Sequence, residues 1–573
     1  MSLSSANRSL QLLMRLVDPK SATEPMIDTL PPKPEITSRN LSSTLPRHKP
    51  ERHGISSSHI QGFLEALAND PSIRLHSVMI IRNGCVLCEA SFGAQDLSVP
   101  RMTFSACKSI TALAIGLLMD DGLLHENDLL TELFPKEGRM ISRHLMRTIT
   151  VGDLLSMRTG NQFNEFSCMT QSDWLEGFFQ SPGLGAKKFH YNSLNTYILS
   201  RIVCKLSNKS LTQFLNDRLF EPMGISDFFW ETCPEGYEKG GWGLYMRAED
   251  LGKLGQLIQN NGNWNGRQLI SHEFLQKATS AQAIAPESCG DFNYGWQFWV
   301  GRTSNKVLMN GMLGQNVLCY RDSGITIVSH AGNDEVFQQS NYFTLAEKFF
   351  GGTFSEHLSK DFWAHHRLHK FCKTLSNSRQ NLPSPKDLSH FAEICYSTNS
   401  PRSASVGLLP VTLQAVQNCY TKGFRSISIS GSPKKIEIVY KENGSEHHII
   451  AGTKTSKEQL LTFGENTFRV AAQARFTHNE DDDPVFILKL DFLETPCTRI
   501  IKLIKTDQGV VLQQSETPCI DRIFNSVLTG SHPAIVSLLS SVFGTGDLEF
   551  LRWRMSLIFS PAIELSQIKK EGA

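Results

Sequence analysis

The sequence has almost no excess of charge and no concentrated basic segment. Its 57 Lys and Arg residues are balanced by 56 Asp and Glu residues, so the formal net charge is +1. A protein that binds nucleic acid or an acidic membrane surface needs a basic face. The charge balance therefore argues against a nucleic-acid partner.

The chain also lacks a long apolar run. A transmembrane helix needs about 20 consecutive apolar residues, and the longest candidate, Ile110 to Met119, is too short. We therefore expect no membrane span and, by default, a cytoplasmic protein. The opening segment MSLSSANRSLQLLMRL is rich in Ser, contains two Arg and has no acidic residue. That composition is typical of an organelle transit peptide, so this alternative stays open.

The thirteen cysteines form no pattern typical of disulfides or of a zinc site. Their odd number and scattered positions are typical of free, buried thiols in a reducing compartment. Cys85 and Cys88 form a CxxC on one predicted strand, where an offset of three residues should point the side chains to opposite faces. No second Cys/His pair follows at zinc-finger spacing. The sequence predicts no metal and no cofactor.

Two changes in composition divide the chain. Residues 20–52 contain six prolines and many Ser, Thr and charged residues, which is typical of a linker or an extended arm. Residues 374–390 form a second polar, Pro-containing stretch, and the pattern that follows is β-rich. We predict a flexible arm over residues 1–52, a first domain over 53–373, a linker over 374–390, a β-rich accessory domain over 391–515 and a helical tail over 516–573.

The first domain combines strand and helix patterns. Ser77 to Phe92 reads as a hairpin because Asn83-Gly84 separates two apolar runs. Ser105 to Met119 is apolar almost all round, as expected of a buried helix. Further strands are expected late in the domain, at residues 307–309, 317–320 and 325–328. Strands at both ends with helices between them predict an α+β fold whose sheet joins early and late segments.

Ser105-Ala106-Cys107-Lys108 is an S-x-x-K sequence at the start of this buried helix. Residues three apart on a helix are neighbours, so the Lys108 amine can reach the Ser105 hydroxyl. A serine hydroxyl becomes a strong nucleophile only when a base takes its proton, and burial can lower the pKa of a lysine enough for that role. The alternative is a chance match, in which Ser105 caps the helix and Lys108 is solvated. An apolar helix start is an unfavourable place for such a lysine.

The segment Phe104 to Ser109 and its helix resemble the first motif of the serine β-lactamase and DD-peptidase superfamily. The similarity is greatest to the branch with class C β-lactamases, family VIII esterases and 6-aminohexanoate-dimer hydrolases. Thr150 to Gly160 resembles that branch's LLxMxSG segment, and Phe220 to Gly224 its PLGM turn. The resemblance covers roughly residues 50–350. It implies an antiparallel sheet flanked by helices with a helical subdomain.

The resemblance also assigns the second motif of the family, Tyr-x-Asn. Tyr191-Asn192-Ser193 lies at the expected place, so Tyr191 is implied as the proton carrier between nucleophile and leaving group. Ser193 replaces the family's Asn and is implied to contact substrate. The alternative for Tyr191 is a purely structural aromatic residue.

The third motif of the family, Lys-Thr-Gly, is the most altered. The best match begins at Met309, which occupies the place of the motif lysine. The resemblance implies that the backbone N–H groups of Met312 and Ser105 form the oxyanion hole, and that substrate meets Asn310, Gly311 and Gln315. In β-lactamases and DD-peptidases the lysine helps to hold the substrate carboxylate, so its absence argues against efficient β-lactam hydrolysis.

Other polar groups fit structural roles. His330 ends a predicted strand and is expected to face solvent. His365, His366 and His369 lie on a predicted helix that no Glu extends to a zincin pattern. Asn479 to Asp483 reads as an acidic loop tip. No GxSxG sequence competes with Ser105.

Together these observations predict a serine hydrolase that forms an acyl-enzyme with a small-molecule ester or amide. Two alternatives stay open. One is an acyltransferase that passes the acyl group to a small alcohol or amine, and the other is a non-catalytic member that uses the pocket for binding. The sequence does not indicate the oligomeric state.

Overall fold

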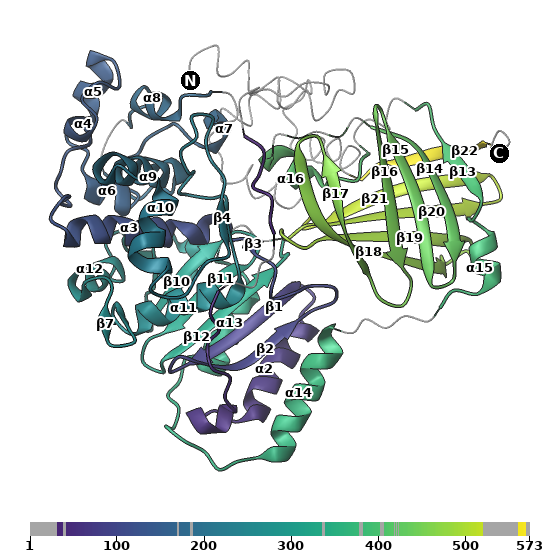
Figure 1. The fold of residues 1–573 in the computed structure, drawn as a ribbon, viewed down its shortest axis with the longest axis horizontal. Coiled ribbons are helices and arrows are strands. Elements are labelled where there is room, and N and C mark those ends of the chain that lie inside the picture. The colour runs from purple at the N-terminus through teal and green to yellow at the C-terminus, as the bar shows by residue number, and fades with distance from the viewer. Residues whose placement is uncertain are drawn as a thin grey trace. The chain divides into compact units, whose positions relative to one another are not determined.

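The computed structural model divides the chain into two compact units, coloured from purple to yellow in Figure 1. The N-terminal unit contains residues 29–92 and 96–375, and the C-terminal unit contains the chain from Ser376 onward. The structure describes residues 31–37, 42–168, 171–183, 187–334, 338–376, 382–400, 406–417, 419, 421, 423–519 and 560–568.

A seven-stranded antiparallel sheet forms the centre of the N-terminal unit. Early strand β1 pairs with late strand β12, with Ile80 opposite Ile327. This pairing confirms that one sheet joins both ends of the domain. The strands, in sheet order, are β2 (Cys85–Ser91), β1 (Leu75–Arg82), β12 (Ile325–Ala331), β11 (Gln315–Tyr320), β10 (Lys306–Gly311), β9 (Trp299–Gly301) and β8 (Phe292–Tyr294).

The β1–β2 hairpin turns at Asn83 and Gly84, whose φ angles of 52° and 73° are both positive. A two-residue hairpin turn of this type needs positive φ at both positions, which explains the Asn-Gly pair. A bulge in β2 shifts the register, so Cys88 lies opposite Ile80 and Cys85 lies opposite Arg82. Both cysteines therefore face the same side of the sheet. The expectation of opposite faces was wrong because it assumed a regular strand.

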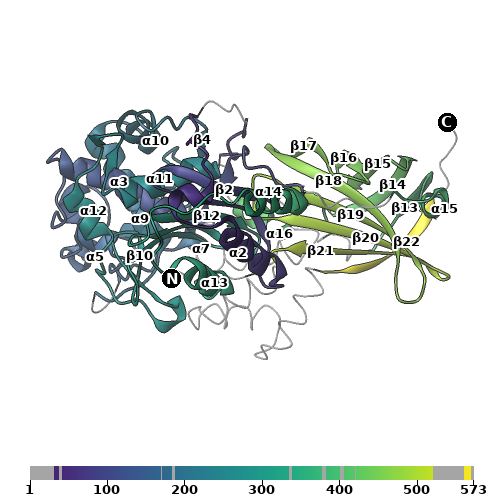
Figure 2. The same cartoon turned by 90° about the horizontal axis from the view of Figure 1, so that it is seen from below.

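Helices cover both faces of this sheet. On one face, α2 (Ser57–Asn69), α13 (Asn341–Phe350) and α14 (Phe362–Ser376) share a core with β1 and β12 (Figure 2). On the other face, α3 (Cys107–Asp120) and α11 (Ala248–Gln259) pack in a second core. The predicted α+β layers are thus confirmed.

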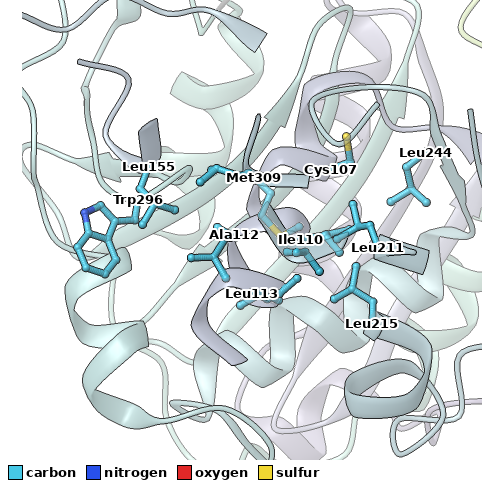
Figure 3. Packing of buried hydrophobic residues seen from close by; sticks show 14 of the residues in the cluster. Cys107, Ile110, Ala112, Leu113, Leu155, Leu211, Leu215, Leu244, Trp296 and Met309 are labelled. Carbon is cyan, nitrogen blue, oxygen red and sulfur yellow. The ribbon is translucent and has the colours of Figure 1, made fainter. Parts of the chain in front are cut away.

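Helix α3 is enclosed on nearly every side, as its apolar sequence predicts. The side chains of Ile110 and Leu113 are fully buried and lie in the cluster drawn in Figure 3. Gly116 leaves room for Phe274, because a Cβ at this position would come within 2.5 Å of that ring. The helix ends at Asp120, and Gly122, with a φ of 69°, turns the chain away two residues later.

The helical subdomain and its small strands come from the part of the sequence between β2 and β8. Its longest helix is α9 (Ser193–Ser207), which the 3.6-residue period of the sequence predicts. The other elements are β3 (Arg101–Met102), α4 (Leu130–Leu133), α5 (Met140–Met146), α6 (Val151–Leu155), α7 (Glu165–Cys168), α8 (Trp174–Phe179), α10 (Leu211–Leu215), β4 (Phe228–Trp230), β5 (Leu244–Met246), β6 (Asn263–Trp264), β7 (Arg267–Gln268) and α12 (His272–Ala278).

The last part of the predicted arm is built into this unit. The backbone of Val86 in β2 exchanges hydrogen bonds with Pro46 and His48, at 2.8 and 3.0 Å. The Leu45 N–H donates to Glu249 Oε1 at 2.6 Å. Order therefore begins before residue 53, because the arm completes hydrogen bonds that β2 leaves open. Residues 1–30 lie outside the described residues.

The C-terminal unit is a ten-stranded sheet that closes on itself. Neighbouring strands are antiparallel, and a parallel bridge between Gly452 and Gln473 joins the first strand of the sheet to the last but one. Alternate residues point inward, so a β-rich domain with period-two patterning is confirmed. The strands, in sheet order, are β16 (Ser445–Gly452), β15 (Lys435–Glu442), β14 (Phe424–Ser432), β13 (Ile394–Ser397), β22 (Ala562–Ile568), β21 (Gly509–Thr517), β20 (Thr498–Thr506), β19 (Pro484–Phe492), β18 (Asn466–His478) and β17 (Lys457–Phe463).

The end of the predicted helical tail is a strand. Ala562 to Ile568 form β22, which pairs with β13 and β21 inside the closed sheet. Its alternation of buried and exposed residues suits a strand with one solvent face. Residues 520–559 of the predicted tail lie outside the described residues. Two short helices, α15 (Pro385–Ser389) and α16 (Val411–Val416), complete the unit.

Among the helices that the structure describes, none combines the length and the apolar character needed to cross a membrane.

Candidate active site

Ser105 lies at a sharp bend just before helix α3, in the short 3₁₀ turn Phe104–Ala106. Phe104 has a φ of 47°, which is unusual for a bulky residue and indicates strained backbone. Thr103 holds the bend, because its N–H and its hydroxyl both donate to the Leu244 carbonyl, at 2.8 and 3.0 Å. Strain of this kind is common where a protein fixes a reactive side chain.

Lys108 reaches back from the first turn of α3 to Ser105. Its Nζ donates to Ser105 Oγ at 2.8 Å and to the Gly241 carbonyl at 2.6 Å. The side chain is 1% exposed, and this burial lowers the pKa of Lys108 to about 8 from its usual 10.5. No acidic side chain of the described residues lies within ion-pair distance of Lys108. A buried amine without a counter-charge is well suited to accept a proton.

Tyr191 completes this group of side chains. Its hydroxyl forms a hydrogen bond with Ser105, and Lys108 Nζ lies 5.1 Å from the centre of its ring. The ring stacks on Trp299 at 5.7 Å. Burial raises the pKa of Tyr191 above its usual value, so the phenol is neutral near pH 7. A neutral phenol can donate a proton and then recover it, whereas Lys108 is the better base.

The β10–β11 turn passes directly beside the nucleophile. A Cβ at Gly311 would come 2.1 Å from the Thr103 carbonyl oxygen, so only glycine fits there. Met312 follows, and the turn closes at Leu313 and Gly314 with φ angles of 65° and 90°. The backbone N–H groups of Met312 and Ser105 could form the predicted oxyanion hole only if this turn lies close to the segment that carries Ser105.

The remaining predicted substrate residues differ in their surroundings. Asn310 is half-buried, and its side chain contacts Gln338 and Asn316 at 2.9 and 2.7 Å. Ser193 is the first residue of α9 and is 5% exposed. Gln315 is 1% exposed, and its Nε2 donates to the carbonyls of the turn and of β12 at 3.1 and 2.7 Å. These bonds favour a role for Gln315 in holding the turn.

His330 is buried, which corrects the expectation that it faces solvent. Only 1% of it is exposed, and its Nδ1 lies 3.0 Å from Gln315 Oε1. Burial and the nearby positive charge of Arg101 lower the pKa of His330 to about 3. The prediction was wrong because the strand continues to Ala331 and pairs on both sides with β1 and β11.

Glu165 is a residue near the site that sequence reasoning did not find. It begins α7, and its Oε1 accepts a hydrogen bond from the Ser193 N–H at 3.3 Å. Its negative charge partly opposes the lowering of the Lys108 pKa by burial and adds to the raising of the Tyr191 pKa by burial. A single acid in an irregular segment carries no motif, so no sequence signal could have identified it.

Met309, in the place of the motif lysine, belongs to the core. It is 1% exposed and packs with Ile110 and Ala112 of α3, as Figure 3 shows. The surroundings are apolar, which explains why an uncharged side chain is stable there.

Among the described residues, one group of side chains has the composition of a metal site. His48, His53 and Cys85 place possible ligand atoms within 4.8 Å of one another. Burial lowers the pKa of His53, and the charges of His48, Arg52 and Arg82 lower it further.

Part of the chain is similar to known proteins. The family model described as Beta-lactamase matches residues 60–356, which is more than half of the chain and includes Ser105, Lys108 and Tyr191. Protein flp of Staphylococcus aureus (strain MW2) is 26% identical over 167 residues, which cover 26% of this chain and 33% of flp. PbpX of Bacillus subtilis (strain 168), named for penicillin binding, is 24% identical over 292 residues, which cover 44% of this chain and 68% of PbpX.

A Bacillus anthracis structure assigned as a 6-aminohexanoate-dimer hydrolase superposes with a TM-score of 0.45 at 16% identity, covering 60% of this chain and 92% of that protein. The matched part of this chain spans a third of the length of flp and about two thirds of PbpX. The family model alone establishes the relationship that the Ser105 and Lys108 motif predicts. The chain belongs to the Beta-lactamase family, whose members are of the serine hydrolase type.

Proposed function

We propose that the N-terminal unit is a serine hydrolase that forms a covalent acyl-enzyme at Ser105 with a small ester or amide. One observation carries this proposal. The buried Lys108 amine lies 2.8 Å from Ser105 Oγ, and no carboxylate of the described residues pairs with it. A lysine held in this way is a base at neutral or mildly alkaline pH.

In the acylation step, Lys108 takes the proton of Ser105 as Oγ forms a bond to the substrate carbonyl carbon. The carbonyl oxygen becomes negative and is held by the backbone N–H groups of Ser105 and Met312. The bond to the leaving group then breaks. Tyr191 donates its proton to the leaving oxygen or nitrogen and recovers a proton from Lys108.

In the deacylation step, water attacks the Ser105 ester. Lys108, through Tyr191, accepts the proton of this water, and the acid product leaves with Ser105 protonated again. A small alcohol or amine in place of water would give acyl transfer by the same route. This acyltransferase is a second candidate, supported by the same three side chains.

A third candidate is a binding protein without turnover. The contacts among Ser105, Lys108 and Tyr191 speak against it, because a binding pocket has no need of a serine activated by a buried lysine. We further propose that β-lactams are poor substrates, since Met309 supplies no charge for their carboxylate.

All thirteen cysteines are free thiols, even Cys88 and Cys372 with sulfurs 3.7 Å apart, which supports a reducing compartment such as the cytoplasm.

The test is labelling of the full chain with a fluorophosphonate probe, followed by turnover of p-nitrophenyl esters. We expect one label on the peptide that contains Ser105, and loss of both label and turnover in Ser105→Ala. Ser109→Ala is the matched control, because this hydroxyl lies on the same helix but donates to the Gln297 carbonyl. Labelling of another serine in Ser105→Ala, with turnover intact, would contradict the proposal.

A further inference from the structure

Gln297 lies in the turn between β8 and β9, residues 295–298, and is only 2% exposed. Its side chain joins two helices of the helical subdomain. The Nε2 donates to the carbonyls of Leu154 and Leu155 in α6, at 3.0 Å each, and the Oε1 accepts the Thr196 hydroxyl of α9 at 2.7 Å. The main-chain N–H also donates to the Leu155 carbonyl at 3.0 Å. One residue of the edge hairpin therefore ties α6 to α9.

The backbone of Gln297 is strained. Its φ is 63°, in the left-handed region that glycine adopts freely and that other residues rarely adopt. Glycine would fit this turn without strain, but it has no amide with which to join the two helices. Strained residues persist where the surrounding contacts compensate for the strain, and they cluster at functional sites. The role of the Gln297 amide is therefore to be sought where α6 and α9 meet.

The segment with Tyr191 is fixed at both ends by these same elements. Before Tyr191, the His190 N–H donates to the carbonyl of Met157, two residues beyond α6, at 2.7 Å. After Tyr191 the chain enters α9, where Thr196 donates to Gln297. These hydrogen bonds form a closed series around Tyr191, and the Gln297 amide is the link that closes it.

The hairpin that carries Gln297 also contacts the Tyr191 ring directly. Trp299, the first residue of β9, stacks on this ring with ring centres 5.7 Å apart and planes inclined by 21°. Tyr294, the last residue of β8, meets the ring edge-on at 6.0 Å. Tyr294 and Trp299 lie opposite each other on the two strands. The position of the Tyr191 hydroxyl beside Ser105 thus depends on how this hairpin and α9 are held together.

We propose that Gln297 is a positioning residue, which holds the Tyr191 hydroxyl where it passes a proton to the leaving group. The inference rests on the proposed function, because it assigns a residue that serves the proton transfer from Tyr191. Gln297 acts through other residues, by fixing α9 and the β8–β9 turn to the same end of α6. Proton transfer needs its donor and acceptor at hydrogen-bond distance, so a small displacement of Tyr191 slows it.

The test compares methyl butyrate with p-nitrophenyl butyrate, which form the same acyl-enzyme at Ser105. Methoxide is a poor leaving group that needs a proton from Tyr191, whereas p-nitrophenolate leaves without one. The kcat/KM of the p-nitrophenyl ester divided by that of the methyl ester therefore reports the proton transfer. A loss of folded protein lowers both values equally and leaves this ratio unchanged.

In the full-length protein, Tyr191→Phe should raise the ratio by about 100-fold, because the proton donor is lost. Gln297→Met keeps the length of the side chain but has no amide, and it should raise the ratio by roughly tenfold through displacement of Tyr191. Both changes should slow the methyl ester far more than the p-nitrophenyl ester.

Two substitutions of Thr196 test the same link without altering the strained turn. Thr196→Val removes the hydroxyl that donates to Gln297 and should also raise the ratio, whereas Thr196→Ser keeps a hydroxyl and should retain the wild-type ratio. Ser200→Ala is the matched control, because this buried hydroxyl lies one turn further along α9 and donates to the Glu238 carbonyl at 2.9 Å. Its loss should leave the ratio unchanged.

Wild-type ratios in both Gln297→Met and Thr196→Val would overturn the positioning role and leave the Ser105 nucleophile intact. An increase in Ser200→Ala equal to that in Thr196→Val would also overturn it, because any loosening of α9 would then have the same effect. A wild-type ratio in Tyr191→Phe would overturn the proton transfer from Tyr191 and this inference with it. A wild type that reacts with neither ester would overturn the proposed function itself.

Discussion

Each of the two units buries a cation completely, but the surroundings of the two cations differ. Lys108 in the N-terminal unit meets a hydroxyl and a carbonyl oxygen. Arg499 in the C-terminal unit meets the Glu516 carboxylate at 3.1 Å, and its Nη2 donates to the Leu409 carbonyl at 2.7 Å. A paired charge holds the chain together, whereas a charge left without its counter-ion can give up its proton.

The N-terminal unit also contains the paired kind. Lys239 is joined to Glu231 at 2.6 Å, and Lys253 to Asp250 at 2.9 Å, with all four side chains nearly inaccessible. Lys108 differs from these lysines in lacking an acid, not in being buried. The pairing of a buried charge therefore distinguishes these two lysines from Lys108, the proposed base.

Removing the unpaired cation should have the largest effect. We expect Lys108→Met to lower kcat/KM by about 10³-fold or more, because Ser105 loses its base. The folded state should be as stable as wild type or slightly more so, since methionine suits an apolar pocket. Ester turnover and thermal unfolding check both statements. Loss of stability with turnover retained would mean that Lys108 is structural.

Removing Arg499, the paired cation, should lower the stability of the C-terminal unit and leave ester turnover unaffected. Arg499→Met leaves Glu516 buried without its counter-charge, at a cost of about 3–5 kcal/mol in unfolding free energy. Lys435→Met is the control, since Lys435 and its partner Glu437 are both exposed, at 49% and 54%; it should leave the unfolding free energy nearly unchanged. Chemical denaturation measures both. Equal costs would show that burial does not matter for these pairs.

A lysine introduced into the core without a counter-ion should show what an unpaired buried charge costs in stability. Met309→Lys would place an ammonium group among the apolar side chains of α3 and should lower the unfolding free energy by about 2–4 kcal/mol. Met309→Leu is the control of similar volume, with an expected cost below about 1.5 kcal/mol. A stable Met309→Lys protein that hydrolyses penicillins would instead show that this position opens to the site.

The smallest effect expected is in pH dependence. Below its pKa of about 8, Lys108 is protonated and cannot accept the Ser105 proton, so kcat/KM should fall about tenfold per pH unit on the acid side and level off above it. Glu165→Gln should move this limb to lower pH, because the charge of Glu165 raises the pKa of Lys108. An acid limb of the kcat/KM profile with an apparent pKa near that of free lysine would mean that the Lys108 amine is solvated.

The sequence predicts the elements that local rules determine. Asn83-Gly84 specifies its turn, the apolar stretch from Ser105 specifies a buried helix, and the spacing of Ser105 and Lys108 predicts their contact. All three are properties of neighbouring residues. The roles of Tyr191 and Met312 came from the family resemblance and stay predictions.

Features that depend on distant partners could not be predicted. The burial of His330 depends on two neighbouring strands, and the facing of Cys88 depends on one bulge in β2. Glu165 lies near the site only because Asn192, further along the chain, holds its loop. Strand β22 was missed because its partners, β13 and β21, come much earlier in the sequence.

Strand β2 lies at the border of the seven-stranded sheet, where unpaired backbone groups would attract strands of other molecules. Residues 45–49 cover part of this border through Val86, and Arg47 fastens them by pairing with Glu89 at 3.0 Å. The segment thus occupies backbone groups of Val86 with which a strand of another molecule could otherwise pair. Cleavage before Ser42 would leave residues 45–49 bound to β2. Cleavage after Lys49 would allow them to dissociate, and we expect the exposed edge of β2 to cause aggregation through strand pairing.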